Sequence, residues 1–209
     1  MPHLKRLTIV AGAALALSVG TAAAIKAPSK GAPFRIADNP NMVANTGVWK
    51  SEFYIRNDKG ELINRYSAQK IMQIHGNLWY QVNKYDYQDG RHEEVRFIGK
   101  PAPDGGIDYV SPDRDYFKDT QRVYRSQGPH LAIWSQVDRK TGREMGVEFV
   151  STFGINRIAS GHVYTWNADF TECLGVDRAS TVHEVKISEP PKEPLFILTA
   201  EERKRLGLE

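Results

Sequence analysis

Short segments rich in β-branched and aromatic residues alternate with turn residues between Gly47 and about Ile187. A turn falls roughly every 8 to 14 positions, a spacing typical of antiparallel sheets. Glycines in the first turns, at Gly60 and Gly76, supply the positive φ that tight hairpins require. The segments are 48–57, 62–75, 78–87, 92–98, 107–110, 122–126, 131–137, 146–153, 156–160, 162–171 and 179–187.

None of these segments carries a long helical period, so the pattern predicts an all-β fold. About 8 to 10 paired strands would close an antiparallel up-and-down barrel and remove the free sheet edges. The one predicted helix is C-terminal, because Thr199-Ala200-Glu201-Glu202 fits a capping box and Gly207 can end the helix. Before it, Leu195 to Leu198 either dock against the barrel or form an apolar hook for a partner protein.

The start of the chain predicts export. Basic residues precede an apolar run from Leu7 to Val19, and small residues lead to Ala24, as in a cleavable secretory signal peptide. The run is shorter than the roughly 20 residues of a membrane-spanning helix. We therefore expect a periplasmic or secreted protein without a membrane anchor, cleaved near Ala24. The expected organisation is a signal peptide over 1–24, an N-terminal arm over 25–45, a barrel over 46–188, and a proline-rich linker with a short helix over 189–209.

Charge and cysteine content narrow the function classes. Removal of the two basic residues Lys5 and Arg6 leaves 26 basic against 25 acidic residues, a formal charge of +1. Nucleic-acid binding needs a concentrated basic surface, so no nucleic-acid partner is expected. The single cysteine, Cys173, cannot form an internal disulfide and is interpreted as a small buried residue.

A tryptophan at the start of the first strand carries a resemblance to known barrels. Lipocalins and other calycins open with a G-x-W triplet, as Gly47-Val48-Trp49 does here. In those families an arginine from the last strands packs over the tryptophan by a cation–π contact and closes the barrel, and Arg178 stands at the corresponding place. Over roughly residues 46–186 the chain resembles an uncharacterised bacterial calycin-like domain family. That resemblance implies a barrel and no established activity. The motifs that carry it are Asp58-Lys59-Gly60-Glu61, Gly76-Asn77-Leu78-Trp79-Tyr80-Gln81-Val82-Asn83-Lys84-Tyr85, Asp89-Gly90, Thr165-Trp166 and the segment 178–185.

Candidate ligand-binding residues follow from strand alternation, which places every second side chain on one face. Trp79, Gln81, Asn83 and Tyr85 share a face of the third segment, where aromatic rings would supply apolar area and the amides would orient a ligand. Equally, these amides could face solvent. Phe53, Trp134 and Trp166 are the candidates from other segments.

Metal and catalytic signatures are weak. The histidines are dispersed without ligand spacing, so no metal site is predicted. No cofactor is expected either, although haem would need one axial histidine, for which His183 is the first candidate. The common motifs of hydrolases and nucleotide-binding enzymes are absent. Glu148, in an apolar segment, is assigned to the outward face.

The sequence thus predicts an exported barrel that binds a small, largely apolar ligand. One alternative is an isomerase, lyase or hydrolase acting on a hydrophobic substrate in the cavity, which a carboxylate or histidine pointing into the pocket would favour. The other is a ligand-free interaction module with a filled barrel. In that case the C-terminal tail or the exposed loops would contact a protein partner.

Overall fold

A computed structural model describes residues 35–102, 107–113, 120–126, 128, 130–168 and 171–208. The predicted signal peptide, over 1–24, lies outside these residues. Within them, ten strands follow a short 3-10 helix and a six-residue α-helix. The elements are η1 (Ile36–Asp38), α1 (Pro40–Asn45), β1 (Gly47–Asn57), β2 (Leu62–His75), β3 (Leu78–Tyr87), β4 (His92–Pro101), β5 (Ile107–Val110), β6 (Thr120–Ser126), β7 (Leu131–Asp138), β8 (Glu144–Phe153), β9 (Asn156–Trp166), β10 (Cys173–Ser188) and α2 (Ala200–Arg205).

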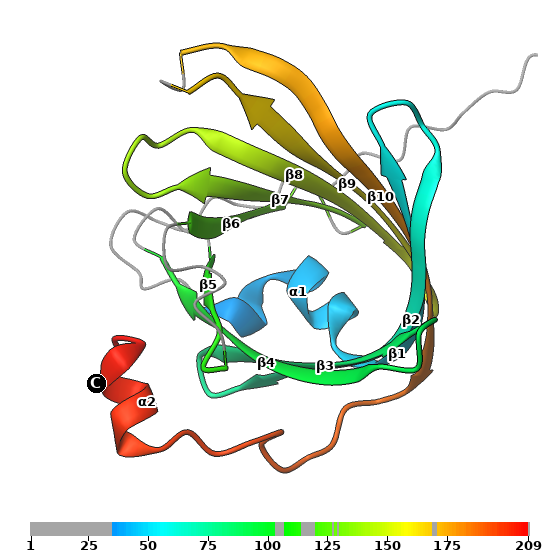
Figure 1. Ribbon diagram of the computed structural model, residues 1–209. Coiled ribbons are helices and arrows are strands. Elements are labelled where there is room, and N and C mark those ends of the chain that lie inside the picture. Colours follow the sequence, from blue (N-terminus) through cyan, green and yellow to red (C-terminus); the bar gives the residue numbers. More distant parts are fainter. Residues whose placement is uncertain are drawn as a thin grey trace, which may run out of the picture.

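The strands form one closed antiparallel barrel (Figure 1). Consecutive strands pair from β1 to β5 and from β6 to β10, and the first strand pairs with the last. The remaining neighbours, β5 and β6, lie side by side and complete the circle. The predicted all-β, antiparallel up-and-down barrel with a short C-terminal helix is therefore confirmed. No helix in the described part of the chain is long and apolar enough to cross a membrane.

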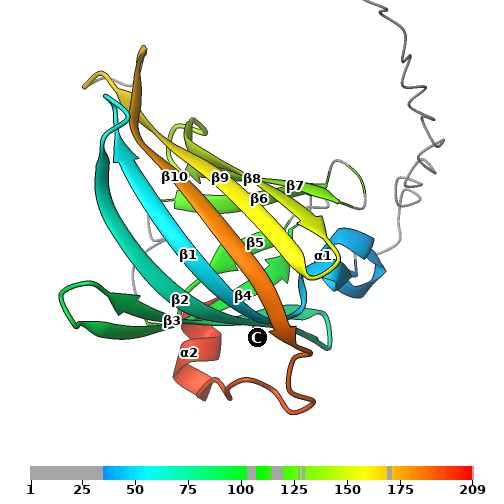
Figure 2. The ribbon, with the colours of Figure 1, turned by 90° about the vertical axis from the view of Figure 1, so that its right-hand side faces the viewer.

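Helix α1 lies within the ring of strands and closes one end, here called the closed end (Figure 1). Asn39 caps the helix by accepting hydrogen bonds from the backbone N–H groups of Asn41 and Met42. Ile36 and Met42 are fully buried in the core cluster of the barrel. A hydrogen bond from the Ile36 N–H to the Asn77 side chain fixes this segment to the β2–β3 turn. Strands β1 and β9 begin at the closed end, and Figure 2 shows them running away from α1.

Gly47 makes the sharp entry into β1. Its φ is +135°, and a Cβ atom added there would lie 2.4 Å from the Lys186 Cε atom and 3.0 Å from the Ser188 carbonyl oxygen. The backbone therefore requires glycine at this position. Two residues later Trp49 points inward and is 0% exposed. The G-x-W triplet thus has the structural use expected of it, a tight turn followed by an indole that fills the barrel end.

The C-terminal tail runs across the outer face of the barrel to α2 (Figure 2). The Gln73 side chain holds the tail backbone: its Nε2 donates to the carbonyl oxygens of Pro191 (2.5 Å) and Glu193 (2.9 Å), and its Oε1 accepts from the Leu195 N–H (3.2 Å). Leu198 is buried in a second apolar cluster with Tyr80 and Ile98. Docking against the barrel is therefore the alternative that the structure shows for this segment.

Helix α2 has the predicted capping box. The Thr199 side chain accepts from the Glu202 N–H, and the Glu202 carboxylate accepts from the Thr199 N–H. The same carboxylate also accepts from Arg96 of β4 at 2.9 Å, and Lys100 Nζ donates to the Leu206 carbonyl oxygen at 2.8 Å. Side chains of β4 therefore hold both ends of α2 on the barrel.

Replacement of Gln73 by alanine should loosen the tail. The change removes three hydrogen bonds at a buried position, so the free energy of unfolding should fall by roughly 1–3 kcal/mol. Urea denaturation measures the loss, and limited proteolysis should cut the variant first within residues 189–199. Gln88→Ala, in an exposed turn, is the control. Equal stability and equal proteolysis of the two variants would contradict this role.

Candidate functional site

Six of the seven predicted ligand-binding residues line one cavity inside the barrel. This inner cavity has a volume of about 140 Å³. An outer cavity of about 230 Å³ lies toward the opposite end and shares five lining residues with the inner one. For scale, a buried cavity of about 150 Å³ can hold benzene. The six residues are Phe53, Trp79, Gln81, Asn83, Tyr85 and Trp134.

Trp166, the seventh, does not line either cavity. It lies at the last residue of β9, at the far end of the barrel from α1. Its indole Nε1 donates to the Glu144 carbonyl oxygen at 3.1 Å, and the Arg143 guanidinium lies over its ring. These contacts give Trp166 a place at the rim of the barrel and keep it apart from the other six.

The inward face of β3 carries a chain of side-chain hydrogen bonds. Trp79 Nε1 donates to Gln81 Oε1 (3.1 Å), Gln81 Nε2 to Asn83 Oδ1 (2.8 Å), and Asn83 Nδ2 to the Tyr85 hydroxyl (2.7 Å). Alternate residues of a strand lie on the same face, so each partner is two positions along. The chain of contacts settles the open question of these amides: they face the interior. It also fixes the orientation of the Gln81 and Asn83 side chains.

Aromatic rings form two further parts of the wall. The Phe53 ring stacks on Tyr66 at 4.5 Å between centroids and meets the edge of Tyr85. Across the barrel, Trp134 contacts Tyr109 and Tyr124. Burial raises the pKa of Tyr109 well above its usual value, so this phenol stays neutral. These rings give the cavity apolar surface beside its amides.

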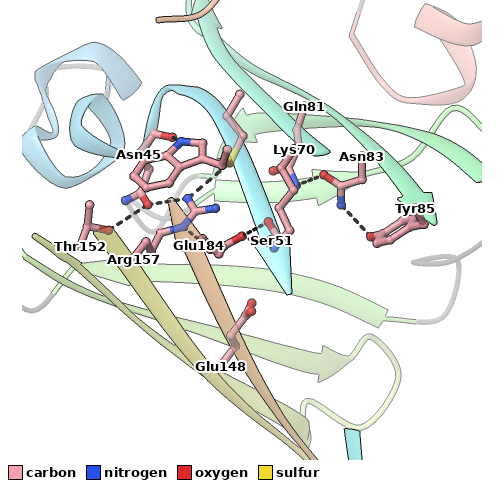
Figure 3. A network of polar contacts seen from close by, with 12 residues as sticks. Asn45, Ser51, Lys70, Gln81, Asn83, Tyr85, Glu148, Thr152, Arg157 and Glu184 are labelled. Atoms are coloured by element: carbon pink, nitrogen blue, oxygen red, sulfur yellow. Dashed lines mark hydrogen bonds and ion pairs between the residues drawn. The ribbon is translucent and has the colours of Figure 1, made fainter. Parts of the chain in front are cut away.

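A buried carboxylate connects four neighbouring strands at the closed end (Figure 3). Glu184 of β10 accepts from the Ser51 hydroxyl of β1 at 2.6 Å and from the Lys70 ammonium of β2 at 2.8 Å. Its second oxygen pairs with Arg157 of β9. Burial alone would raise the pKa of Glu184, but the charges of Lys70 and Arg157 and their hydrogen bonds hold it far below its usual value. Glu184 therefore stays ionised and is a poor proton acceptor.

Arg157 also closes the barrel over Trp49. Its guanidinium lies 4.4 Å from the centre of the indole ring, and its Nη1 donates to Asn45 Oδ1 at 2.8 Å. Asn45 in turn accepts from the Trp49 Nε1 through its backbone oxygen and from the Thr152 hydroxyl through its side chain. The end of α1, the start of β1, the end of β8 and the start of β9 thus meet at Asn45.

The assignment of Arg178 to this closing contact is wrong. Because β10 runs antiparallel to β1, Arg178 lies opposite Asn57. Asn57 is eight residues beyond Trp49, or about 26 Å of strand. The Arg178 side chain is 57% exposed and pairs with Asp177. The cation–π contact exists, but the arginine comes from β9 and not from the last strand.

The assignment of Glu148 to the outward face is also wrong. Glu148 lines the inner cavity and forms an ion pair with Arg122 of β6. The Arg122 guanidinium lies 5.3 Å from the centre of the Trp134 ring. Register explains the inward position, because Glu148 lies opposite Trp134 of β7, which also faces the cavity.

Two other residues lie on the surface. His183 is exposed on the outer face, with its ring against Tyr54, so it cannot serve as an axial ligand inside the barrel. Cys173 is exposed as well, which contradicts its interpretation as a buried residue. Among the residues that the structure describes, no group of three or more His, Cys, Asp or Glu side chains could hold a metal ion.

Charged residues of the interior were missed by the sequence analysis. Lys70, Arg157 and Glu184 each lie on a strand next to small or apolar residues that share their face. In β2 the inward positions 68, 70 and 72 read Ala, Lys and Met. A charged residue inside an alternating apolar face is the signal that could have identified them.

No protein-family model matches the chain, and no curated protein matches it. The closed ten-strand antiparallel barrel is consistent with a calycin-like fold.

Replacement of Trp49 by alanine should cost about 3–5 kcal/mol of unfolding free energy, because it leaves a large cavity at the closed end and removes the ring under Arg157. Chemical denaturation followed by circular dichroism measures this loss. Trp166→Ala, at the rim, should cost less. Equal losses of unfolding free energy for the two variants would contradict the larger contribution to stability expected of Trp49.

Glu184 predicts a specific pH dependence of stability. Its folded-state pKa is lowered, so its contribution is fully present above the ordinary glutamate pKa and is lost as pH falls toward the folded value. At pH 7, Glu184→Gln should cost about 3–5 kcal/mol, because two cations lose their counterion. The gap from wild type should narrow between pH 5 and pH 3. The exposed variant Glu94→Gln is the control, and a pH-independent gap would contradict the assignment.

Proposed function

We propose that this protein is an exported barrel that binds a small molecule in its interior. The observation that carries the proposal is the pair of adjoining cavities, whose walls combine aromatic rings with amides already oriented by hydrogen bonds. A concave site that combines apolar surface with fixed polar groups is typical of ligand-binding barrels. The alternative of an interaction module with a filled barrel is less well supported, because the two cavities leave space inside the barrel.

The ligand expected from the sequence is mostly apolar, and the cavity walls offer polar surface as well as rings. Phe53, Tyr85 and Trp134 offer ring surface on both sides of the inner cavity. Gln81 and Asn83 lie between the rings and offer hydrogen bonds to one polar group. The ligand should therefore have an apolar body and at least one polar end.

Export and family membership belong to the same proposal. Export rests on the signal-like sequence over 1–24, and the mature protein would act in the periplasm or outside the cell. The G-x-W opening and the barrel support a place in the bacterial calycin-like family that the sequence resembles. A protein partner at the tail is supported by Ile197, which is 87% exposed beside the docked Leu198.

Native mass spectrometry tests ligand binding directly. The protein, purified without denaturant, should carry an excess mass that disappears on denaturation. Ala159→Leu should reduce this excess, because Ala159 lines the inner cavity and the larger side chain fills it. Ala179→Leu, at an outward register position of β10, is the matched control. A protein without excess mass that also fails to bind the apolar dye N-phenyl-1-naphthylamine would refute the proposal.

A second candidate function is catalysis on a hydrophobic substrate. The observation in its favour is the Glu148 carboxylate, which lines the cavity and could act as an acid or base. If the protein is an enzyme, the released ligand should be converted to a product of altered mass or altered chromatographic retention on incubation with fresh protein. Glu148→Gln should abolish this conversion. A ligand unchanged in both mass and retention after incubation would leave the carrier function alone.

A further inference from the structure

The described lining of the inner cavity holds more positive than negative charge. Of the residues that the structure describes, three cationic side chains line this cavity, Lys70, Arg122 and Arg157, against two carboxylates, Glu148 and Glu184. Arg122 and Glu148 pair with each other and neutralise one another. The excess of one positive charge therefore lies in the cluster of Lys70, Arg157 and Glu184, where two cations share one carboxylate.

This cluster is buried, which makes the excess charge costly. The side chains of Arg157 and Glu184 are 5% and 1% exposed. An unbalanced charge in such a place is disfavoured unless a counterion or hydrogen-bond partner compensates it. A protein that keeps two cations on one carboxylate here has a site ready to accept a second negative charge.

Lys70 is the member of the cluster that faces the cavity. Its side chain is 10% exposed, and because it points into the barrel this surface faces the cavity. An ammonium has three donors, and among the described contacts it donates to one acceptor, Glu184. Arg157, by contrast, is engaged with Glu184, Asn45 and the Trp49 ring. Among the described contacts, the donors left over in the cluster are those of the Lys70 ammonium and of the Arg157 Nη2 group, and Lys70 is the more exposed of the two side chains.

The surroundings of Lys70 change from polar to aromatic along the barrel. Asn83 lies directly opposite Lys70 in the β2–β3 register, and its amide shares the same cavity. The Phe53 ring lies 4.6 Å from the Lys70 ammonium, and Tyr66 stacks behind it toward the far end. Among the described residues, the acid that lines the outer cavity is Glu93, which accepts from the Tyr87 hydroxyl near the far end. Positive charge thus gathers at the closed end and an acidic group at the other.

We propose that the natural ligand is a small amphipathic anion with a single negative charge. Its head group, a carboxylate or an equivalent oxyanion, binds the Lys70 ammonium and the Asn83 amide at the closed end. Its apolar body extends past Phe53 and Tyr85 toward the outer cavity. The inference rests on the proposed binding function and adds the charge and the orientation of the ligand.

Matched competitors test the charge. The dye N-phenyl-1-naphthylamine, which is neutral, reports occupancy of the cavity by its fluorescence, and decanoate or decan-1-ol displaces it below the concentration at which either aggregates. The alcohol is the more apolar of the two, so a cavity without excess positive charge would bind it more tightly. Wild-type protein should instead bind decanoate at least as tightly as decan-1-ol.

Lys70→Met tests the assignment to one residue. The substitution leaves Arg157 and Glu184 as a balanced pair, so the fold should be retained. Decanoate binding should weaken about 10- to 100-fold, the loss of affinity that corresponds to removal of one hydrogen bond to a charged group. Binding of decan-1-ol should change little. Lys84→Met, on the outer face of β3, should alter neither.

The outcomes separate this inference from the proposed function. Tighter binding of decan-1-ol than of decanoate by wild-type protein would overturn the proposal that the ligand is an anion, whether or not the variant folds. A decanoate preference that survives Lys70→Met would overturn the place of the head group. If neither competitor nor the dye binds, the binding function fails, and this inference fails with it.

Discussion

Glu184 accepts hydrogen bonds from Ser51, Lys70 and Arg157, and through them it joins β10 to β1, β2 and β9. The closed end of the barrel depends on this contact. Two cations could not remain buried there without the carboxylate, because an unpaired buried charge is strongly destabilising. Once Glu184 holds Arg157, the guanidinium lies over Trp49 and bonds to Asn45, so the position of α1 also follows from it. Helix α1 and the strands of the closed end are therefore joined by one network of polar contacts.

Different walls of the barrel interior carry different kinds of side chain. On one side the charged cluster is satisfied mainly by protein groups, and on β3 the amides satisfy one another in a line that ends at Tyr85. Between them the rings of Phe53 and Trp134 offer apolar surface. No buried polar side-chain atom in the described residues lacks a partner. A barrel arranged in this way keeps a hollow without leaving orphaned polar groups, which is what an interior binding site requires.

The fold was readable from the sequence because alternation, turn glycines and the capping box are local signals. One predicted strand boundary was wrong because it was placed at a glycine that does not form a turn. The break expected near Gly161 does not exist, because β9 runs through it, and a Cβ atom there would meet the Ser180 hydroxyl of the neighbouring strand. The face of β3 could not be chosen from alternation alone, and Arg178 was misplaced because register across β1 and β10 depends on contacts far apart in sequence. Long-range register is the information that single-sequence patterns lack.

The pairing of the first strand with the last bears on how the chain reaches its final structure. Ser51 and Glu184 are 133 residues apart, so the contact that completes the closed end forms only when nearly the whole chain is present. Contacts of such long range slow folding, because the intervening chain must lose conformational entropy before the contact forms and offsets that loss. Until β10 arrives, Lys70 and Arg157 have no counterion and the interior must stay open to water. Closure of the barrel and removal of that water are therefore one late, cooperative step.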